Sequence, residues 1–261
     1  ISTIAATGTT TGKAPGSVTV TATDVNSPTS GTATLTVTGT QATRVAPTGG
    51  FQSWWPLDGD GTDHNSTNDG TVESGAAFVA GLVDEALLLD GIDDKVTAPN
   101  DPLLNPTSEI TVEAWFQPTA FTSTGNESIV NKGFTTHSPP YYQYHLGVTG
   151  DLSTFSFWVA AGGSVVALET PNDTWVPGTW YHVAGTYDGT TARLYVNGDL
   201  IVSQAASGAL TDYGRDLVIG GFSNLSTPTP GIVDEVAIHS VALSEAQVQA
   251  IHAAFAAGRC K

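Results

Sequence analysis

The sequence predicts an all-β protein: a two-sheet antiparallel sandwich with a short C-terminal helix. Many short runs of β-branched and aromatic residues alternate with polar ones, and turn-forming residues separate them. The stretch from Gly178 to Ile201 holds two such runs and begins a third, with turns at Asp188-Gly189 and Asn197-Gly198. Asn-Gly is a strong hairpin signal because both residues tolerate positive φ. A meander of this kind cannot bury its apolar face alone, so we expect a second sheet to cover it.

The composition limits the class of partner. The 261 residues carry a formal net charge of −17, which argues against nucleic acid and against an anionic membrane surface. No run approaches the ~20 apolar residues of a membrane span, so we expect no membrane insertion. The abundance of Thr, Gly, Ser, Val and Asp is typical of a secreted or cell-surface β-protein.

The termini suggest a piece of a longer protein. The chain begins at Ile1 and contains no Met, so we expect it to be processed from a longer precursor. The single Cys260 cannot form an internal disulfide; a free thiol, an intermolecular link and the start of a continuation all remain open.

Two domains of unequal size are expected. In residues 1–40, the runs Ser17–Asp24 and Gly31–Gly39 alternate small apolar residues with threonines, which predicts two half-buried strands. Residues 41–50, QATRVAPTGG, contain Pro and paired Gly and are interpreted as a linker. Residues 51–261 form the second domain.

The strands expected in the second domain, besides the central meander, are apolar or alternating runs bounded by turn residues. They are Ala86–Leu89, Lys95–Ala98, Ile110–Gln117, Ser128–Asn131, Gln143–Val148, Thr154–Ala160, Val165–Thr170, Leu217–Gly220 and Gly231–His239. In the third of these, Ile110, Val112, Ala114 and Phe116 are expected on one face, with Glu113 on the other. Many short strands without interleaved helices indicate a β-sandwich.

One helix is expected near the C-terminus. Ser244 with Gln247 three residues later forms a capping box. Val248, Ile251 and Phe255 give a narrow apolar stripe, and Gly258 stands where a C-terminal cap belongs. We expect this helix to dock on the sandwich.

Seven phrases, in a characteristic order, give the chain a family resemblance from about Phe51 to Arg259. They are WPLDGDGTDHNSTNDGT, GLVDEALLLDGIDDKV, ITVEAWFQP, IVNKG, TWYHVAGTYDGTTARLYVNG, LVIGG and GIVDEVAIHSVALSEAQV. Together they resemble a laminin-G-like, concanavalin-A-like jelly-roll domain, which implies two curved antiparallel sheets packed face to face. The N-terminal segment resembles the closing strands of a bacterial immunoglobulin-like domain. It is too short for the complete sandwich of that class.

The resemblance also implies a calcium ion where the first and last strands meet. The matching positions are Asp58, Asp90, Gly91 and Asp234, with Asp63 as an additional candidate. Carboxylates and backbone carbonyls are the ligands that Ca²⁺ takes, and the role of such an ion would be structural first. Asp-Gly pairs are also ordinary turn formers, so this alternative stays open.

The motifs of glycoside hydrolysis and other common catalytic sites are missing from the sequence. No Glu is followed by Asp two residues later, so the E-x-D-x-x-E pattern of β-glucanases does not occur. There is no G-x-S-x-G and no H-E-x-x-H. His182 and His239 lie within strands and are interpreted as structural residues. We therefore expect a protein that binds without catalysis.

Loop aromatics are the candidate ligand-binding residues, because sugars are held by flat aromatic faces and a few polar groups. Trp115, Trp158 and Trp180 lie within strand patterns and are assigned to the core. The candidates are His137, Tyr141, Tyr142, Tyr144, Trp175 and Tyr213. Packing within the loops is the alternative.

The sequence thus favours an adhesion or carbohydrate-binding module with a glycan or an extracellular protein as partner. The alternative is a structural subunit, in which the incomplete N-terminal segment pairs with copies of the same chain by strand addition and builds a surface fibre. A third hypothesis is an accessory module of a polysaccharide-degrading enzyme.

Overall fold

The computed structural model describes residues 16–23, 30–37, 49–120, 126–133, 140–221 and 229–254. The chain divides into two compact units, Ile1–Thr43 and Arg44–Lys261. In the first unit β1 (Gly16–Thr23) and β2 (Ser30–Val37) pair antiparallel, in a register from Gly16 with Val37 to Thr23 with Ser30. The rest of the immunoglobulin-like segment, residues 41–48 of the linker, and Cys260 lie outside the described residues. Strand addition by a neighbouring chain stays a prediction.

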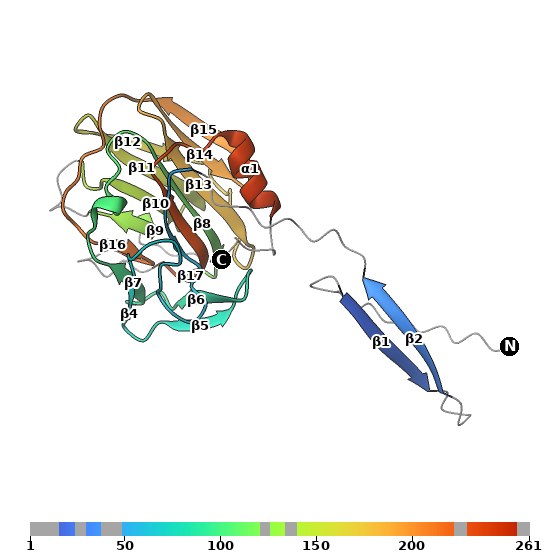
Figure 1. Cartoon of the computed structure of the whole chain (residues 1–261). Coiled ribbons are helices and arrows are strands. Elements are labelled where there is room, and N and C mark those ends of the chain that lie inside the picture. Colours follow the sequence, from blue (N-terminus) through green and yellow to red (C-terminus); the bar gives the residue numbers. More distant parts are fainter. Residues whose placement is uncertain are drawn as a thin grey trace. The chain divides into compact units, whose positions relative to one another are not determined.

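The second unit is a two-sheet antiparallel sandwich, as predicted (Figure 1). One sheet has seven strands. Their order is β12 (Ser164–Glu169), β11 (Thr154–Ala161), β10 (Tyr144–Thr149), β9 (Asn126–Lys132), β16 (Leu217–Ile219), β7 (Lys95–Ala98) and β4 (Thr71–Glu73). The other sheet has eight. Its order is β15 (Asp199–Ala205), β14 (Thr191–Val196), β13 (Tyr181–Tyr187), β8 (Ile110–Pro118), β17 (Gly231–His239), β6 (Glu85–Leu89) and β5 (Ala77–Ala80), and β3 (Phe51–Trp55) also pairs with β17.

Strand β17 has two partners on one side, which creates a fork in the eight-stranded sheet. Residues 231–233 pair with β6, whereas residues 236–239 pair with β3. Between the two partners a bulge interrupts the pairing with β8, and Glu235 takes a φ of +54°. The fork therefore joins the first strand of the sandwich, β3, to the last, β17. Asp234 and Glu235 lie on β17 between the segment that pairs with β6 and the segment that pairs with β3.

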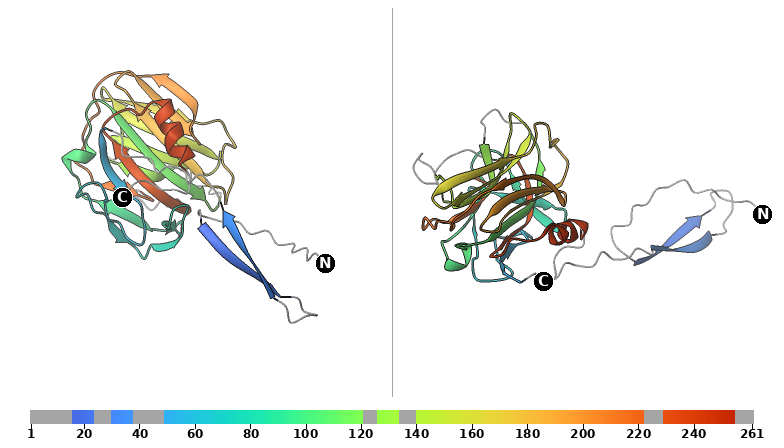
Figure 2. Two further views of the ribbon diagram at one scale, coloured as in Figure 1. Left: turned by 45° about the vertical axis from the view of Figure 1, so that its right-hand side comes forward. Right: turned by 90° about the horizontal axis from the view of Figure 1, so that it is seen from above.

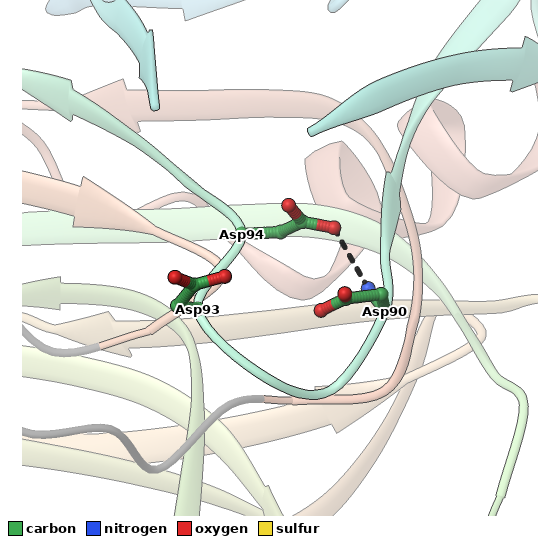
Figure 3. Close-up of side chains that lie close together, drawn as sticks. All are labelled: Asp90, Asp93 and Asp94. Atoms are coloured by element: carbon green, nitrogen blue, oxygen red, sulfur yellow. Dashed lines mark hydrogen bonds between the residues drawn. The ribbon is translucent and has the colours of Figure 1, made fainter. Parts of the chain in front are cut away.

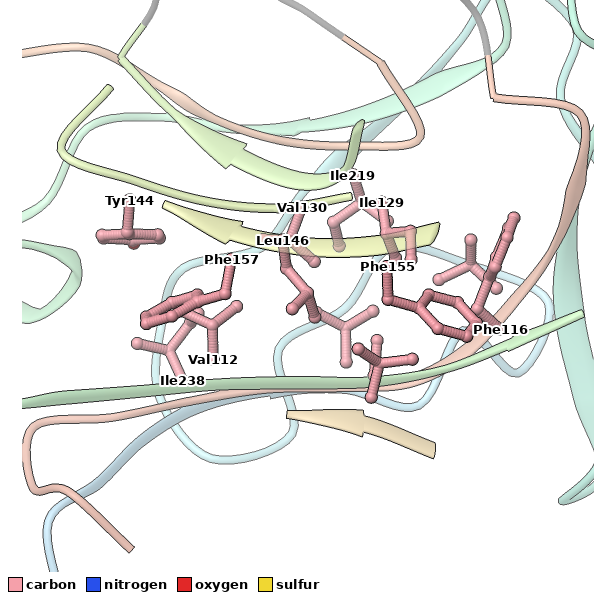
Figure 4. Close-up of a cluster of buried hydrophobic side chains, with 14 of the residues drawn as sticks. Val112, Phe116, Ile129, Val130, Tyr144, Leu146, Phe155, Phe157, Ile219 and Ile238 are labelled. Carbon is pink, nitrogen blue, oxygen red and sulfur yellow. The ribbon is translucent and has the colours of Figure 1, made fainter. Parts of the chain in front are cut away.

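The core lies between the sheets, where alternate residues of facing strands meet (Figure 4). Ile110, Val112, Ala114 and Phe116 of β8 are fully buried in it, as the alternation predicts. From the seven-stranded sheet, strand β11 contributes Phe155, Phe157 and Val159. The periodicity of two thus separates the core face of each strand from its outer face.

Gly185 of β13 leaves the space that the Phe157 ring fills. A Cβ at this position would lie 2.0 Å from the ring. We expect Gly185→Ala to lower the free energy of unfolding by about 1–3 kcal/mol, because the ring must leave its place in a close-packed core. Urea denaturation measures the change. Gly221→Ala is the matched control, since nothing lies within 4 Å of a Cβ there; equal losses in both variants would contradict the expectation.

Helix α1 (Glu245–Ala253) packs on the outer face of the eight-stranded sheet, as Figure 2 shows. Val248 and Ile251 contact Ala184 and Tyr195 of the sheet. The predicted capping box is present, because Gln247 Oε1 accepts hydrogen bonds from the backbone amide and hydroxyl of Ser244. The helix ends at Ala253, earlier than a Gly258 cap implied, and Phe255 and Gly258 lie outside the described residues.

Three strands of the sandwich were not predicted from the sequence: β3, β4 (Thr71–Glu73) and β5 (Ala77–Ala80). Strand β4 has only three residues, too few to show a period. In β3, Ser53, Trp54 and Trp55 are all buried, so the strand lacks the alternation of a half-exposed one.

Candidate functional site

Four ring side chains gather on the outer face of the seven-stranded sheet: Tyr141, Tyr142, His145 and Trp158, here called the aromatic patch. The Tyr142 ring stacks on the His145 ring with centroids 4.9 Å apart. Trp158 lies 5.7 Å from both of these rings, and Tyr141 lies 6.2 Å from Tyr142. Tyr141 and Trp158 remain partly exposed, so the patch offers ring surface to a ligand.

Strand alternation and one glycine build the patch. Tyr144, Leu146 and Val148 of β10 point into the core, so His145 and Gly147 point outward. His145 is directly opposite Trp158 of β11. A Cβ on Gly147 would lie 2.3 Å from His145 Nε2, so the imidazole can lie against the strand only because residue 147 has no side chain.

His145 is neutral within the patch. It is 1% exposed, and burial lowers its pKa to about 3. Its Nδ1 lies 3.3 Å from Ser128 Oγ and its Nε2 lies 3.4 Å from Ser156 Oγ. Burial also raises the pKa of Tyr142 to about 12, so this phenol stays protonated. The patch carries no charge at neutral pH.

Two buried donors flank His145 along one row across the sheet. His145 pairs with Trp158 on one side and with Asn131 of β9 on the other. Neither Trp158 Nε1 nor Asn131 Nδ2 has a hydrogen-bond partner among the described residues. A buried donor without an acceptor costs about 1–3 kcal/mol. Both donors are screened from solvent, so the patch offers a ligand the exposed ring surface of Tyr141 and Trp158, which matches the C–H face of a sugar.

The structure divides the predicted ligand residues. Tyr141 and Tyr142 belong to the patch. Tyr144 is fully buried and donates its hydroxyl to Leu104 O at 3.0 Å. Trp175 is 2% exposed and donates Nε1 to Thr154 O at 3.2 Å. Both are core residues without a free ring face, so their assignment to a ligand site is corrected here.

Two further predicted positions stand apart from the patch. Tyr213 packs over Gly133, where a Cβ would lie 3.4 Å from its ring. His137 lies outside the described residues. Conversely, Trp158 was assigned to the core and His145 received no role. The alternation of residues in β11 could have predicted the position of Trp158. Phe157 and Val159 both face the core, so Trp158 between them must face outward.

Two of the predicted calcium ligands, Asp58 and Asp234, lie near the fork on β17, where Asp58 Oδ1 accepts a hydrogen bond from the Glu85 amide at 3.0 Å. Asp234 is fully buried, and its Oδ2 accepts hydrogen bonds from the amides of Leu82 and Val83 at 2.8 and 3.0 Å. Its Oδ1 has no partner among the described residues. Burial, with the nearby negative charges of Glu235 and Asp58, raises the pKa of Asp234 to about 8. Without a cation the group is therefore mostly protonated at neutral pH, and a bound cation would favour its ionised form.

Asp63, another predicted calcium ligand, is not available to an ion at the fork. Its Oδ1 accepts hydrogen bonds from the amides of Trp54, Asn65 and Ser66, at 2.9, 2.9 and 3.1 Å. Its Oδ2 accepts one from the Ser66 hydroxyl. These bonds fasten the following loop to β3, and they occupy the oxygens that a metal ion would need.

Asp90 and Gly91 lie at the opposite end of β6 from the fork. Gly91 lies against Pro230, whereas Asp234 lies against Gly81 and Ala86, about four residues or roughly 13 Å away along the strand. Asp90 gathers instead with Asp93 and Asp94 in one turn, and Asp94 Oδ2 accepts a hydrogen bond from the Asp90 amide at 3.0 Å (Figure 3). One ion cannot reach all five predicted ligands, and only Asp58 and Asp234 remain together.

A buried polar network occupies the outer face of the eight-stranded sheet. Glu113 is fully buried; its Oε2 lies 3.1 Å from His182 Nε2 and its Oε1 lies 2.9 Å from His239 Nε2. The Trp115 ring lies 5.2 Å from His182, and His252 of α1 stacks on it at 5.6 Å. Both strand histidines are thus held by Glu113 through Nε2, whereas the buried Nδ1 of His182 has no hydrogen-bond partner among the described residues.

The family follows from the sequence match. Residues 90–249 match the Concanavalin A-like lectin/glucanases superfamily. The chain belongs to this superfamily. No curated protein matches it.

Several solved structures share this fold at low sequence identity. The binding domain of Paraclostridial Mosquitocidal Protein 1 has a TM-score of 0.61 and 17% identity, over 73% of this chain and 48% of that one. Domain 4 of AbnA, a GH43 extracellular arabinanase from Geobacillus stearothermophilus, was solved with arabinotriose; it has a TM-score of 0.60 and 19% identity, over 77% of this chain and 97% of that one. A Trypanosoma rangeli sialidase has a TM-score of 0.59 and 17% identity, over 79% of this chain and 33% of that one.

The extent of these matches differs. This chain spans about half of the mosquitocidal protein's binding-domain chain and a third of the sialidase chain, but nearly all of the arabinanase domain. No helix in the described ranges is long and apolar enough to cross a membrane.

Proposed function

We propose that the chain is a non-catalytic, extracellular carbohydrate-binding module and that the aromatic patch holds the glycan. The patch carries this proposal because it groups partly exposed ring surface from Tyr141 and Trp158 on one face of the sheet. A sugar ring can stack its C–H face on the exposed ring surface of Trp158 and Tyr141. The arabinanase domain solved with arabinotriose supports this ligand class, since the chain matches nearly the whole of that domain.

Catalysis is not part of the proposal. Glycoside hydrolysis requires two carboxyl groups on either side of the scissile bond, and the four residues of the patch include none. The buried carboxyl group of Glu113 lies on the other sheet and is already bonded to two imidazoles.

We expect a glycan array to detect binding to one class of sugar, with arabinotriose as the first soluble probe. Trp158→Ala should weaken that binding at least tenfold, because truncating a central aromatic side chain typically costs about 2 kcal/mol or more. Trp180→Ala is the matched control, since Trp180 is also half-buried but lies outside the patch. The proposal fails if the folded chain binds no glycan, or if both tryptophan variants bind as the wild type does.

We also propose that Asp58 and Asp234 hold a structural calcium ion at the fork. The buried Oδ1 of Asp234, which lacks a hydrogen-bond partner among the described residues, supports a fit to a hard cation that takes oxygen ligands. The ion would neutralise the carboxylates that join the first and last strands.

Calcium should therefore raise the melting temperature of the chain, and Asp234→Asn should abolish the increase. At one hundred times its dissociation constant, a ligand that binds only the folded state adds about 2.7 kcal/mol. Calorimetry with calcium and with chelator measures this difference. Asp93→Asn is the control, because Asp93 is exposed and lies in the turn at the other end of β6. An increase that persists in Asp234→Asn but disappears in Asp93→Asn would move the ion to that turn.

A further inference from the structure

A cavity of about 330 Å³ lies on the outer face of the eight-stranded sheet, between strands β14 and β15 and the start of α1. Ala192, Leu194 and Val196 of β14 face the core, so Arg193 and Tyr195 face the cavity. Asp188, Leu200 and residues 242–245 line the rest. The volume falls at the lower end of the range of small-molecule sites, roughly 300–1,000 Å³.

A fixed ion pair positions the guanidinium donors of Arg193 in the cavity. Arg193 Nη1 donates to Asp188 Oδ2 at 2.6 Å. The other oxygen of Asp188 accepts hydrogen bonds from the amides of Thr190 and Thr191 and from the Thr190 hydroxyl. Although burial opposes it, these bonds hold the pKa of Asp188 well below its usual range, so Asp188 stays ionised. The other guanidinium N–H groups of Arg193 make no hydrogen bond to the described residues.

The charges and surfaces of the lining select a class of ligand. Arg193 contributes one positive charge, and Asp188 and Glu245 contribute two negative ones, so the lining repels anions. Leu200 is 40% exposed and offers an apolar wall. The guanidinium donors of Arg193 and the exposed carboxylate of Glu245 beside an apolar wall suit a neutral ring with hydroxyl groups.

We propose that this cavity is a second carbohydrate subsite, which takes a neutral sugar ring between Arg193, Asp188 and Leu200. The ligand class rests on the proposed function, whereas the location does not. The aromatic patch and the cavity lie on the outer faces of opposite sheets. One chain can therefore hold two separate glycan chains and join them.

The side-chain Nε–H signal of Arg193 reports on the cavity directly. The chain has four arginines, so the ¹⁵N spectrum of these groups is simple, and Arg193→Lys assigns the signal. Glucose, galactose, mannose, xylose and arabinose are titrated separately up to the tens-of-millimolar range, together with any glycan found on the array. We expect at least one to shift the Arg193 signal saturably.

Two variants on one strand separate the cavity from its surroundings. Leu200 and Ile201 of β15 are each 40% exposed, but only Leu200 lines the cavity. Leu200→Trp should fill the cavity and abolish the Arg193 shift, whereas Ile201→Trp should preserve it. Absence of a saturable shift with every sugar, or a shift that Leu200→Trp leaves unchanged, overturns the proposal.

Trp158→Ala makes failure of the two sites distinguishable. If this variant loses array binding and keeps the Arg193 shift, both sites stand. If array binding depends on Trp158 but the Arg193 signal never moves, the cavity proposal fails and the proposed function stands. If the Arg193 signal moves and Trp158→Ala binds the array as the wild type does, the cavity proposal stands and the aromatic-patch proposal fails.

Discussion

Glu113→Leu is expected to lower the free energy of unfolding by about 2–6 kcal/mol. The variant leaves two buried imidazole N–H groups, on His182 and His239, without their acceptor, and each unsatisfied donor costs about 1–3 kcal/mol. Glu113→Gln should lose less, because its amide keeps one acceptor oxygen. Urea denaturation monitored by tryptophan fluorescence measures both changes.

Glu169→Gln serves as the control for this series, because Glu169 is an exposed carboxylate on the edge strand β12. Its stability should stay within about 0.5 kcal/mol of the wild type. If Glu113→Leu were as stable as this control, the network beneath α1 would have no structural role.

Acid should destabilise the sandwich through His145. Burial lowers the pKa of His145 to about 3 in the folded chain, whereas an unfolded histidine titrates near 6.5. The fold prefers the neutral ring, so this contribution to stability is complete above about pH 6.5 and is lost as the pH falls toward 3. The loss can reach roughly 4–5 kcal/mol, at about 1.4 kcal/mol for each pH unit between the two pKa values.

His145→Gln removes this titration and should flatten the dependence of unfolding free energy on pH between about 6.5 and 3 relative to the wild type. Urea denaturation at a series of pH values tests it. His64→Gln is the control, because His64 is exposed. If the slopes for wild type and His145→Gln coincide, His145 is not buried in its neutral form.

Alternation and turn chemistry made the fold predictable from the sequence. Strand β8 shows why, since its core residues Ile110 and Phe116 alternate with Glu113 and Trp115 on the other face. The capping box of Ser244 and Gln247 likewise marks the start of α1 with local chemistry alone. Strands β3 and β4 escaped prediction because burial on both faces, or a length of three residues, removes the periodic signal.

The candidate site was harder to predict because it depends on which strands pair. The cluster of tyrosines in the sequence mixed an inward residue, Tyr144, with the patch residues Tyr141 and Tyr142. Trp158 is distant in sequence, and only the pairing of β10 with β11 brings it opposite His145. The predicted calcium ligands are separated in the structure for a similar reason. Asp90 follows one end of β6, whereas Asp234 of β17 lies against the other end.

The six indole Nε1–H signals of the chain give the most direct measurement of whether the aromatic patch binds a glycan. Trp158 Nε1 has no acceptor in the described structure, whereas the indoles of Trp54, Trp55 and Trp175 donate to Glu235, Asn68 and Thr154. On titration with the bound oligosaccharide, the ¹⁵N spectrum should show the largest saturable shift at Trp158 and little change at the three bonded indoles. Saturable binding that leaves the Trp158 signal in place would contradict a glycan site on the aromatic patch.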